Sequence, residues 1–426
     1  MKATIISIGN ELLNGKTVNS NAAFIAAKLY EIGIVTGRVV AIRDETAAIL
    51  ESLEQALAQS EVVITTGGLG PTPDDITKNA LADFFQCEMV FHEAIWQKIE
   101  QRFRQRGIPA PEVNRVQAWI PAKARLLDNP IGTAPALHFE TPVPGGIAAG
   151  GAARHTLVLP GVPQEMKTIM AESVIPFLRE INTAGLIEVH LYRTTGVAES
   201  KIYEHCRALL ESRPEYEVAF LPKTTGVDLR IALREKDAAK KQRFAEFEAG
   251  LFQTIGKYIY TTGPEELEEV VGKLLRERRL TLAAAESCTG GLVQDKITDV
   301  AGSSDYFLGG MVAYSNESKM RHLGVRAESL QRYGAVSEAA AKEMAEGVRR
   351  AFGADIGIST TGIAGPGGAT PEKPVGLIYL GLATVQKTVA KKFLLIGDRV
   401  MIKERGAQAA LELLRRELLG MENTTR

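Results

Sequence analysis

Apolar and polar positions in the first part of the chain alternate between two patterns. The run 3–8 is mostly apolar and rich in β-branched residues, which is typical of a parallel strand buried on both faces. Over 20–30 the apolar positions take a helical period instead. The same pair of patterns returns at 34–42 with 46–58. Strands alternating with helices of this length predict a doubly wound α/β domain over residues 1–183, with ligands at the carboxyl ends of its strands.

Two further units follow along the chain. Residues 184–258 carry the patterns of strand, helix, strand, strand and helix, which predict a small α+β unit. Over 259–426 strands and helices alternate again, predicting a second α/β domain that ends in the amphipathic helix 402–418. The stretch 141–154 is rich in Gly, Ala and Pro and has neither period, so we expect a mobile surface hairpin or loop without chemistry there.

Composition and charge narrow the classes of function. Lys plus Arg total 50 and Asp plus Glu total 51, a formal net charge of -1, which leaves no broad cationic surface for nucleic acid or anionic lipid. The expected partner is therefore a small molecule. The cysteines, Cys87, Cys206 and Cys288, lie far apart and form no CxxC pair, which indicates a reducing compartment. Because the first apolar run is too short for a signal sequence or a membrane span, we expect a cytoplasmic protein.

The segment LTLAAAESCTGGL, residues 280–292, predicts a buried strand that turns sharply into a helix. The turn exposes Ser287 like a nucleophile, and Thr289, Gly290 and Gly291 follow it. Glycines there let backbone N–H groups approach an anion or a developing oxyanion. The alternative is a serine that merely caps the helix, and this segment alone favours that interpretation.

A second segment, GGMVAYSNESKMRHLGV, places Tyr314, Asn316 and Lys319 after another apolar strand. A lysine can deprotonate a serine when burial and neighbouring groups lower its pKa, which gives the Ser/Lys form of nucleophilic catalysis. Taken alone, Lys319 is more typical of a solvated helix charge, and His322 of a surface or capping histidine.

A third segment, ADIGISTTGIAGPGG, predicts a strand that ends at Thr360 and Thr361 and enters a glycine-rich loop. The loop glycines are Gly362, Gly365, Gly367 and Gly368. Backbone amides and hydroxyls of this kind suit a phosphate or a ribose, although a tight turn that needs positive φ would use the same residues. Three glycine-rich strand ends in one small domain predict one shared site at the carboxyl edge of the sheet.

The first domain has a glycine-rich loop of its own, VVITTGGLGPTPDDITK. Its glycines, Gly67, Gly68 and Gly70, precede Asp74, Asp75 and Lys78. Glycine amides can hold phosphate, adjacent carboxylates can hold Mg²⁺, and a lysine can balance phosphate charge, so the loop suits a diphosphate. Alternatively, the two acids only cap a helix that begins near Asp75.

These segments resemble a known family. ESCTGG, YSNESK, GAVSEAAAKEMAEG and TGIAGPGGATPEKPVG are similar to the C-terminal domain of the CinA family (competence/damage-inducible protein A), known as a nicotinamide mononucleotide deamidase. The resemblance implies that Ser287 is the acylated nucleophile, Lys319 its base, and that no cofactor is needed. It implies that Tyr314 and Thr361 bind the substrate or its oxyanion. It also implies substrate contacts from Thr289, Gly290, Gly291, Asn316, Gly362, Gly365 and Arg399, whereas Lys403 stands where an arginine is expected.

The segments GNELLNGKTVNSNAAFIAAKL, NPIGTAPAL and LPGVPQEM resemble the CinA N-terminal domain and, more distantly, molybdopterin-binding adenylyltransferases. The resemblance implies an ADP-ribose pyrophosphatase that uses Mg²⁺ or a similar divalent metal. It implies substrate contacts from Glu11, Asn21, Gly67, Gly68 and Gly161, and metal ligands Asp44, Asp74, Asp75 and Glu165. The loop itself adds Gly70 and Lys78 as expected substrate contacts. Two positions depart from the family pattern: Asn10 replaces an expected acid and Ala136 an expected glycine.

The middle unit resembles the KH-like module of full-length CinA proteins but lacks the GxxG backbone clamp, so we expect a connector or lid rather than a nucleic-acid site. Together the segments predict a bifunctional pyridine-nucleotide hydrolase, a homodimer by family likeness. Three alternatives stay open. The first domain could adenylylate molybdopterin, the protein could be a regulatory nucleotide-binding module with an inactive site, or Cys288 could replace Ser287 as nucleophile.

Overall fold

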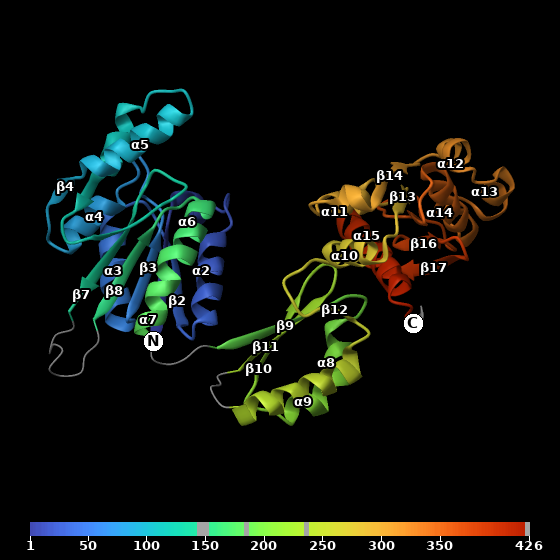
Figure 1. Cartoon of the computed structure of the whole chain (residues 1–426), viewed down its shortest axis with the longest axis horizontal. Coiled ribbons are helices and arrows are strands. Elements are labelled where there is room, and N and C mark those ends of the chain that lie inside the picture. Colours follow the sequence, from blue (N-terminus) through green and yellow to red (C-terminus); the bar gives the residue numbers. More distant parts are fainter. Residues whose placement is uncertain (143–152, 183–186, 234–237, 422–426) are drawn as a thin grey trace. The chain divides into compact units, whose positions relative to one another are not determined.

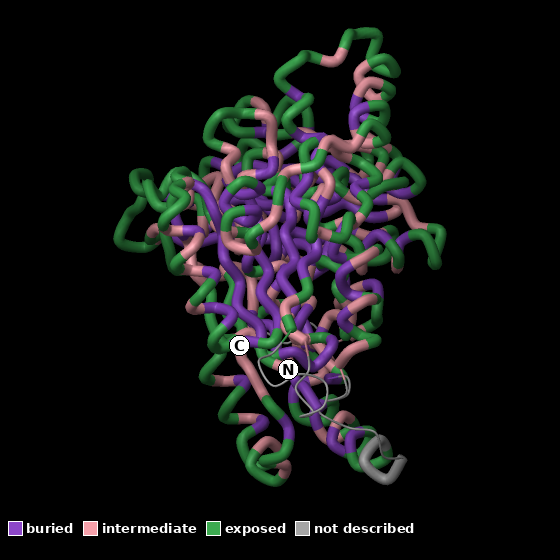
Figure 2. The backbone as a smooth tube through the Cα atoms, turned by 90° about the vertical axis from the view of Figure 1, so that its left-hand side faces the viewer, coloured by how far each residue is buried: buried purple, intermediate pink, exposed green. Residues whose placement is uncertain are grey.

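The computed structural model describes residues 1–142, 153–182, 187–233 and 238–421, without the side chains of 238–241 (Figure 1). The chain forms two compact units, Met1–Glu188 and, beyond it, Val189–Leu233 with Ala238–Arg426. Buried residues concentrate on the strands, as Figure 2 shows. In the parts of the chain with described placement, every helix is too short or too polar to cross a membrane.

The first unit is a doubly wound α/β domain, as predicted. Its six-stranded sheet has the order β2-β1-β3-β8-β7-β6, in which the first four strands are parallel and the last two antiparallel. The strands are β1 (Lys2–Ile8), β2 (Val35–Ile42), β3 (Val62–Thr66), β6 (Arg125–Leu127), β7 (Ala136–Thr141) and β8 (Arg154–Leu159). Separate apolar clusters cover its two faces, because β-branched residues of β1 and β3 point alternately to each side.

Helices cover both faces of this sheet. On one face lie α2 (Ser20–Glu31), α6 (Pro163–Ile169) and α7 (Ile175–Ile181), and on the other α3 (Thr46–Gln59) and α4 (Thr77–Phe84). The remaining elements are α1 (Asn10–Leu13), α5 (Glu93–Gln105), a 3₁₀ helix (Glu112–Ala118), a π-helical turn (Met170–Val174), and the hairpin of β4 (Met89–Phe91) and β5 (Trp119–Pro121).

Two expectations for the first unit need comment. The helix after the glycine-rich loop begins at Thr77, not near Asp75, because the Asp75 carboxylate accepts hydrogen bonds from the N–H and hydroxyl of Thr72 in the preceding turn. Most of the predicted loop 141–154 lies outside the described residues, while its flanking strands pair antiparallel with Thr141 opposite Arg154.

The middle module has the predicted order of strand, helix, strand, strand and helix. Its elements are β9 (Glu188–Thr194), α8 (Glu199–Glu211), β10 (Glu217–Pro222), β11 (Val227–Leu233) and α9 (Ala238–Ile255). A further strand, β12 (Ile259–Thr261), pairs antiparallel with β9, so the four-stranded sheet has the order β10-β11-β9-β12. The middle sheet therefore extends through Thr261.

The C-terminal α/β domain has a five-stranded sheet in the order β14-β13-β15-β16-β17. The parallel strands are β13 (Leu282–Glu286), β14 (Phe307–Val312) and β15 (Ile356–Gly362). β16 (Leu377–Ala383) pairs antiparallel with β15, and β17 (Thr388–Leu394) pairs antiparallel with β16. Because β13 lies between its two parallel neighbours, the three predicted glycine-rich strand ends do meet at one edge of the sheet.

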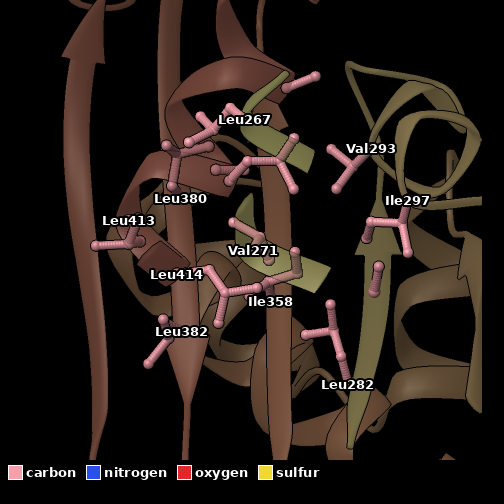
Figure 3. Packing of buried hydrophobic residues seen from close by; sticks show 14 of the residues in the cluster. Leu267, Val271, Leu282, Val293, Ile297, Ile358, Leu380, Leu382, Leu413 and Leu414 are labelled. Atoms are coloured by element: carbon pink, nitrogen blue, oxygen red, sulfur yellow. The ribbon is translucent and has the colours of Figure 1, made fainter. Parts of the chain in front are cut away.

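Helices sandwich this sheet as well. One face packs against α12 (Asn316–Leu323), α13 (Ala327–Tyr333) and α14 (Glu338–Phe352), and the other against α10 (Leu267–Arg278), α11 (Leu292–Thr298) and α15 (Arg399–Leu418). Figure 3 shows the second core, where Leu413 and Leu414 of α15 meet Val271 of α10 and strand residues such as Leu382. The last helix begins three residues before the predicted 402–418, because the side chain of Asp398 caps it.

Glu286 ends β13 and is the anion that caps α11. Its side chain is buried at 1% exposure. Oε2 accepts hydrogen bonds from the Thr289 hydroxyl at 2.6 Å and the N–H groups of Gly291 and Val293 at 2.9 and 3.1 Å. Oε1 accepts from the backbone and side-chain amides of Gln294 at 2.9 and 3.1 Å. A carboxylate can be buried here because five donors replace its water.

We predict that Glu286→Gln destabilises the protein, because its NH₂ group would face N–H donors that need an acceptor. The expected loss is about 2–3 kcal/mol in the free energy of unfolding, measured by urea denaturation. Glu317→Gln is the matched control, since Glu317 is exposed in the first turn of α12 and its change should stay within about 0.5 kcal/mol. Equal stability of the two variants would contradict the capping role.

Candidate active site

Ser287 and Lys319 meet at the carboxyl edge of the C-terminal sheet. The Lys319 Nζ atom lies 3.0 Å from the Ser287 Oγ atom, and both side chains are buried, at 1% and 8% exposure. The N–H of Ser287 donates to the carbonyl of Thr360 at 2.9 Å, which fixes the turn to β15. Lys319 is therefore not a solvated helix charge. Ser287 is not a helix cap either, because α11 begins at Leu292 after Gly291.

The surroundings of Lys319 lower the pKa of its amine. Its Nζ atom also lies 2.8 Å from the carbonyl oxygen of Ala313 and 3.1 Å from that of Tyr314. Within the described part of the chain, Lys319 forms no ion pair with a carboxylate. Burial lowers its pKa, and the nearby Cys288 opposes this only in part. In its neutral form the amine would donate hydrogen bonds to the two carbonyls, and its lone pair could accept the proton of the Ser287 hydroxyl.

Cys288 is the residue after Ser287, and its thiol is poorly suited to be the nucleophile. It is buried, and burial raises its pKa to about 12, with a further rise from the charge of Glu286. Only the thiolate is strongly nucleophilic, so this environment argues against the alternative that Cys288 is acylated.

The turn after Ser287 provides fewer donors than the sequence suggests. The N–H of Gly291 is bound by Glu286 and is not free for a substrate anion. The Thr289 side chain is fully buried and also donates to Glu286, so the predicted substrate contact of Thr289 would come from its backbone. The hydrogen bonds found between described residues leave the N–H groups of Thr289 and Gly290 unused. These two amides are the candidates for binding an oxyanion.

Two cations of α15 lie at the same edge. Arg399 donates from Nη1 to the carbonyl of Gly365 at 2.7 Å and from Nη2 to the Tyr314 hydroxyl at 3.1 Å, which joins the loops after β15 and β14. The Tyr314 side chain is 61% exposed and therefore accessible to a ligand. Lys403 follows one turn later, with Nζ 3.6 Å from the point that a Cβ on Gly290 would occupy. Lysine at this position therefore still directs a positive charge toward the Ser287 turn.

The other predicted residues of this domain have different roles. Thr361 is buried and donates its hydroxyl proton to the carbonyl of Ala335 at 2.8 Å, so that proton is not available to an oxyanion. Gly362 is required by packing, since a Cβ there would come within 2.6 Å of Ile378. Asn316 is exposed at the start of α12, one turn before Lys319.

In the first unit the structure brings part of the predicted site together. Gly67 and Gly68 have φ values of +117° and +68°, which favour glycine. Asn21 donates from Nδ2 to the Thr66 hydroxyl at 3.0 Å and to the carbonyl of Gly161 at 2.8 Å. Its Oδ1 atom is buried and has no hydrogen-bond partner among the described residues. Asn21 and Gly161 therefore lie against the glycine-rich loop, with one acceptor left open.

Lys78 does not point its ammonium group into solvent, where the predicted phosphate would bind. It is buried, and its Nζ atom donates to the carbonyl of Val116 at 2.6 Å. Burial lowers its pKa to about 8, although the charge of Asp75 opposes the shift. The ammonium group is used within the protein and, as placed, is not an exposed phosphate ligand.

The four predicted metal ligands do not form a metal cage. Among the described residues no group of three or more His, Cys, Asp or Glu side chains could hold a metal ion. Three of the carboxylates bind local partners instead: Asp44 the N–H of Asn10, Asp75 Thr72, and Glu165 the side-chain amide of Asn129. Asp74 and Glu11 are exposed, and Gly70 lies against the Asp75 carboxylate. A divalent cation here would need further ligands from a substrate.

Comparison with protein families assigns all three parts of the chain. Residues 4–180 match the model described as "Probable molybdopterin binding domain". Residues 190–261 match the "Damage-inducible protein CinA KH domain", and residues 264–418 the "CinA C-terminal domain".

Full-length relatives agree with these matches. The chain is 44% identical over 421 residues to the CinA-like protein of Kosmotoga olearia, covering 98% of this chain and 99% of the relative. It is 42% identical over 425 residues to the CinA-like protein of Chloroherpeton thalassium, covering 98% and 99%. The crystal structure of the competence/damage inducible protein CihA from Agrobacterium tumefaciens shares 36% identity, covers 36% of this chain and 96% of its own, and gives a TM-score of 0.34. Because the two CinA-like proteins match this chain over almost their full length and its own, the protein belongs to the CinA family.

Proposed function

We propose that the C-terminal domain hydrolyses the amide of nicotinamide mononucleotide, with Ser287 as nucleophile and Lys319 as base. The observation that carries this proposal is the 3.0 Å contact between the Lys319 Nζ and Ser287 Oγ atoms. It joins a hydroxyl to an amine whose pKa is lowered by burial, as nucleophilic catalysis by a Ser/Lys pair requires.

The reaction would proceed in two stages. Ser287 Oγ attacks the carboxamide carbon while its proton moves to Lys319 Nζ, and the N–H groups of Thr289 and Gly290 bind the oxyanion. Lys319 then returns the proton to the amide nitrogen, the C–N bond breaks, and ammonia leaves. In the second stage water attacks the acyl ester while Lys319 takes its proton. Lys319 then returns this proton to Ser287 Oγ as the ester C–O bond breaks. The products are nicotinate mononucleotide and free Ser287.

The cations of α15 account for a phosphorylated substrate. Arg399 contacts the carbonyl of Gly365 and the Tyr314 hydroxyl, while Lys403 lies near Gly290 and forms no ion pair with a described residue. A phosphate monoester is the anion that such a pair would bind. Tyr314, which is exposed and held by Arg399, would contact the ribose or the ring.

We predict that Ser287→Ala lowers the kcat for ammonia release by at least about a thousandfold, because the acyl-enzyme cannot form. Cys288→Ala is the matched control at the next position, and it should keep kcat within about threefold, because that thiol is buried and protonated. The assay is release of ammonia from nicotinamide mononucleotide. If the effects of the two substitutions were reversed, the nucleophile would be the thiol.

We predict that deamidation becomes faster as pH rises toward the pKa of Lys319. Only the neutral amine can accept a proton, and burial moves its pKa below the ordinary value of 10.5. On the acid side kcat/KM should rise roughly tenfold per pH unit. Lys319→Arg should be inactive across the same range, since a guanidinium stays protonated. A wild-type rate that is flat or falls between neutral and alkaline pH would exclude lysine as the base.

We propose a second activity for the first unit, hydrolysis of ADP-ribose to AMP and ribose 5-phosphate with a divalent metal. The observation that favours it is the unpaired Asn21 Oδ1 atom, on a side chain that lies against the glycine-rich loop after β3. Gly67 and Gly68 of this loop have positive φ values, and the same loop contains Asp74 and Asp75. The oxygen donors of the two aspartates suit Mg²⁺ when phosphate oxygens complete its shell. Bound there, the cation would neutralise charge on the diphosphate. Transfer of AMP to a molybdopterin is the alternative, in line with the family match of residues 4–180.

We predict that chelation separates the two activities. EDTA should abolish AMP release from ADP-ribose, because it removes the cation that would neutralise charge on the diphosphate. Ammonia release should change by less than about twofold, since the Ser287 mechanism uses only protein groups. Adenylylated pterin formed from ATP, with no AMP released from ADP-ribose, would favour the transferase alternative.

A further inference from the structure

The helix that carries the cations of the candidate site also contacts the middle module. Both cations lie in the first two turns of α15: Arg399 contacts the loops after β15 and β14, and Lys403 lies near Gly290 in the Ser287 turn. Two residues after Lys403, Arg405 donates from Nε to the carbonyl of Thr224 at 2.9 Å, and Thr224 lies in the turn between β10 and β11. Its Nη1 atom donates to the carbonyl of Ile396, just before α15. One guanidinium thus joins the module to the chain that enters the helix.

A second contact repeats this link one turn further along α15. Gln408 is buried and lies with Nε2 at 3.4 Å from the hydroxyl of Thr195, at the end of β9. Thr195 in turn donates to the carbonyl of Thr225 at 3.3 Å. The two Thr-Thr-Gly turns of the module, 194–196 and 224–226, are therefore tied to each other and to α15.

These contacts lie close to the site along a rigid element. A helix rises 1.5 Å per residue, so Arg405 is only about 3 Å along the axis from Lys403 and about 9 Å from Arg399. The chain between Ile396 and α15 contains Asp398, whose side chain caps the helix by accepting from the N–H of Met401 at 2.9 Å. A loss of the Arg405 contacts would free both the first turn of α15 and the loop before it.

We propose that the middle module braces α15, and that Arg405 is a positioning residue for the Ser287 site. The inference rests on the proposed deamidase function. The brace holds Arg399 and Lys403 where the phosphate of the substrate binds, while Ser287 and Lys319 are placed by β13 and α12. It therefore controls substrate affinity more than the chemical step, and it gives this KH-like module a role without nucleic acid.

The far end of α15 provides a matched control. Arg416 donates from Nη1 to the carbonyl of Lys257 at 3.5 Å, which is also a contact between a guanidinium and a backbone carbonyl of the middle module. It lies 11 residues beyond Arg405, or about 16 Å further along the helix. Removing it tests the general effect of losing such a contact, at a point too distant to move the cations.

The test is steady-state ammonia release from nicotinamide mononucleotide by the full-length chain. Arg405→Ala should raise KM about tenfold with kcat within about threefold, because a displaced binding group weakens binding while the catalytic pair is intact. Arg405→Lys should restore KM in part, since an ammonium can replace only one of the two contacts. Arg416→Ala should leave both parameters within about twofold of wild type.

A substitution in the middle module weakens the same link without changing a residue of the C-terminal domain, so its effect on KM cannot come from misfolding caused by a substitution in that domain. Thr195→Val removes the acceptor of Gln408 from the module side and should raise KM about threefold at unchanged kcat. Circular dichroism and thermal unfolding check each variant. Equal KM values for Arg405→Ala and Arg416→Ala, or a fall in kcat at unchanged KM, would overturn the brace. Absence of turnover by the wild-type chain would overturn the deamidase proposal instead.

Discussion

The C-terminal site depends on the buried amine of Lys319, which contacts the Ser287 hydroxyl and two backbone carbonyls. A lysine removed from water usually pairs with a carboxylate, which would raise its pKa and prevent it from acting as a base. Lys319 contacts the carbonyl oxygens of Ala313 and Tyr314 instead, which accept hydrogen bonds and carry no full negative charge. The sheet makes this arrangement possible, because the parallel strands β13 and β14 bring Ser287 and these carbonyls to one edge.

Burial, with a contribution from Glu286, makes the thiol of Cys288 less suited than the Ser287 hydroxyl to the proposed reaction. The field of a helix N-terminus would normally stabilise a thiolate at Cys288. Here the anion at the N-terminus of α11 is the Glu286 carboxylate, and its charge contributes to the raised pKa of Cys288. The same carboxylate uses the N–H of Gly291 and so limits the donors for an oxyanion to the preceding residues. One buried acid thus orders the turn, adds to the effect of burial that raises the pKa of the thiol, and leaves the N–H groups of Thr289 and Gly290 as candidates for binding an oxyanion.

Periodicity predicted the fold well, and the side-chain environments less well. Uninterrupted apolar runs locate buried parallel strands, so the shared edge of β13, β14 and β15 followed from the sequence. The burial of Lys319 did not, because it depends on α12 packing against α14, a contact that the local pattern does not contain. Glu286 was missed although an acid ends a buried strand before Thr-Gly-Gly and a helix, and that pattern is a usable signal for an internal cap.

In the first unit, the residue types that suit a metal did not reveal the local partners of their side chains. Asp44, Asp75 and Glu165 each satisfy a local N–H or hydroxyl, and that geometry depends on turns that residue type does not reveal. The consequence for chemistry is specific. With fewer than three grouped ligands among the described residues, a divalent ion would bind weakly without a nucleotide, and the diphosphate would bring the metal with it. Recognition would then rest on the unpaired Asn21 Oδ1 atom and on loop N–H groups other than that of Gly67, which donates to the carbonyl of Leu159.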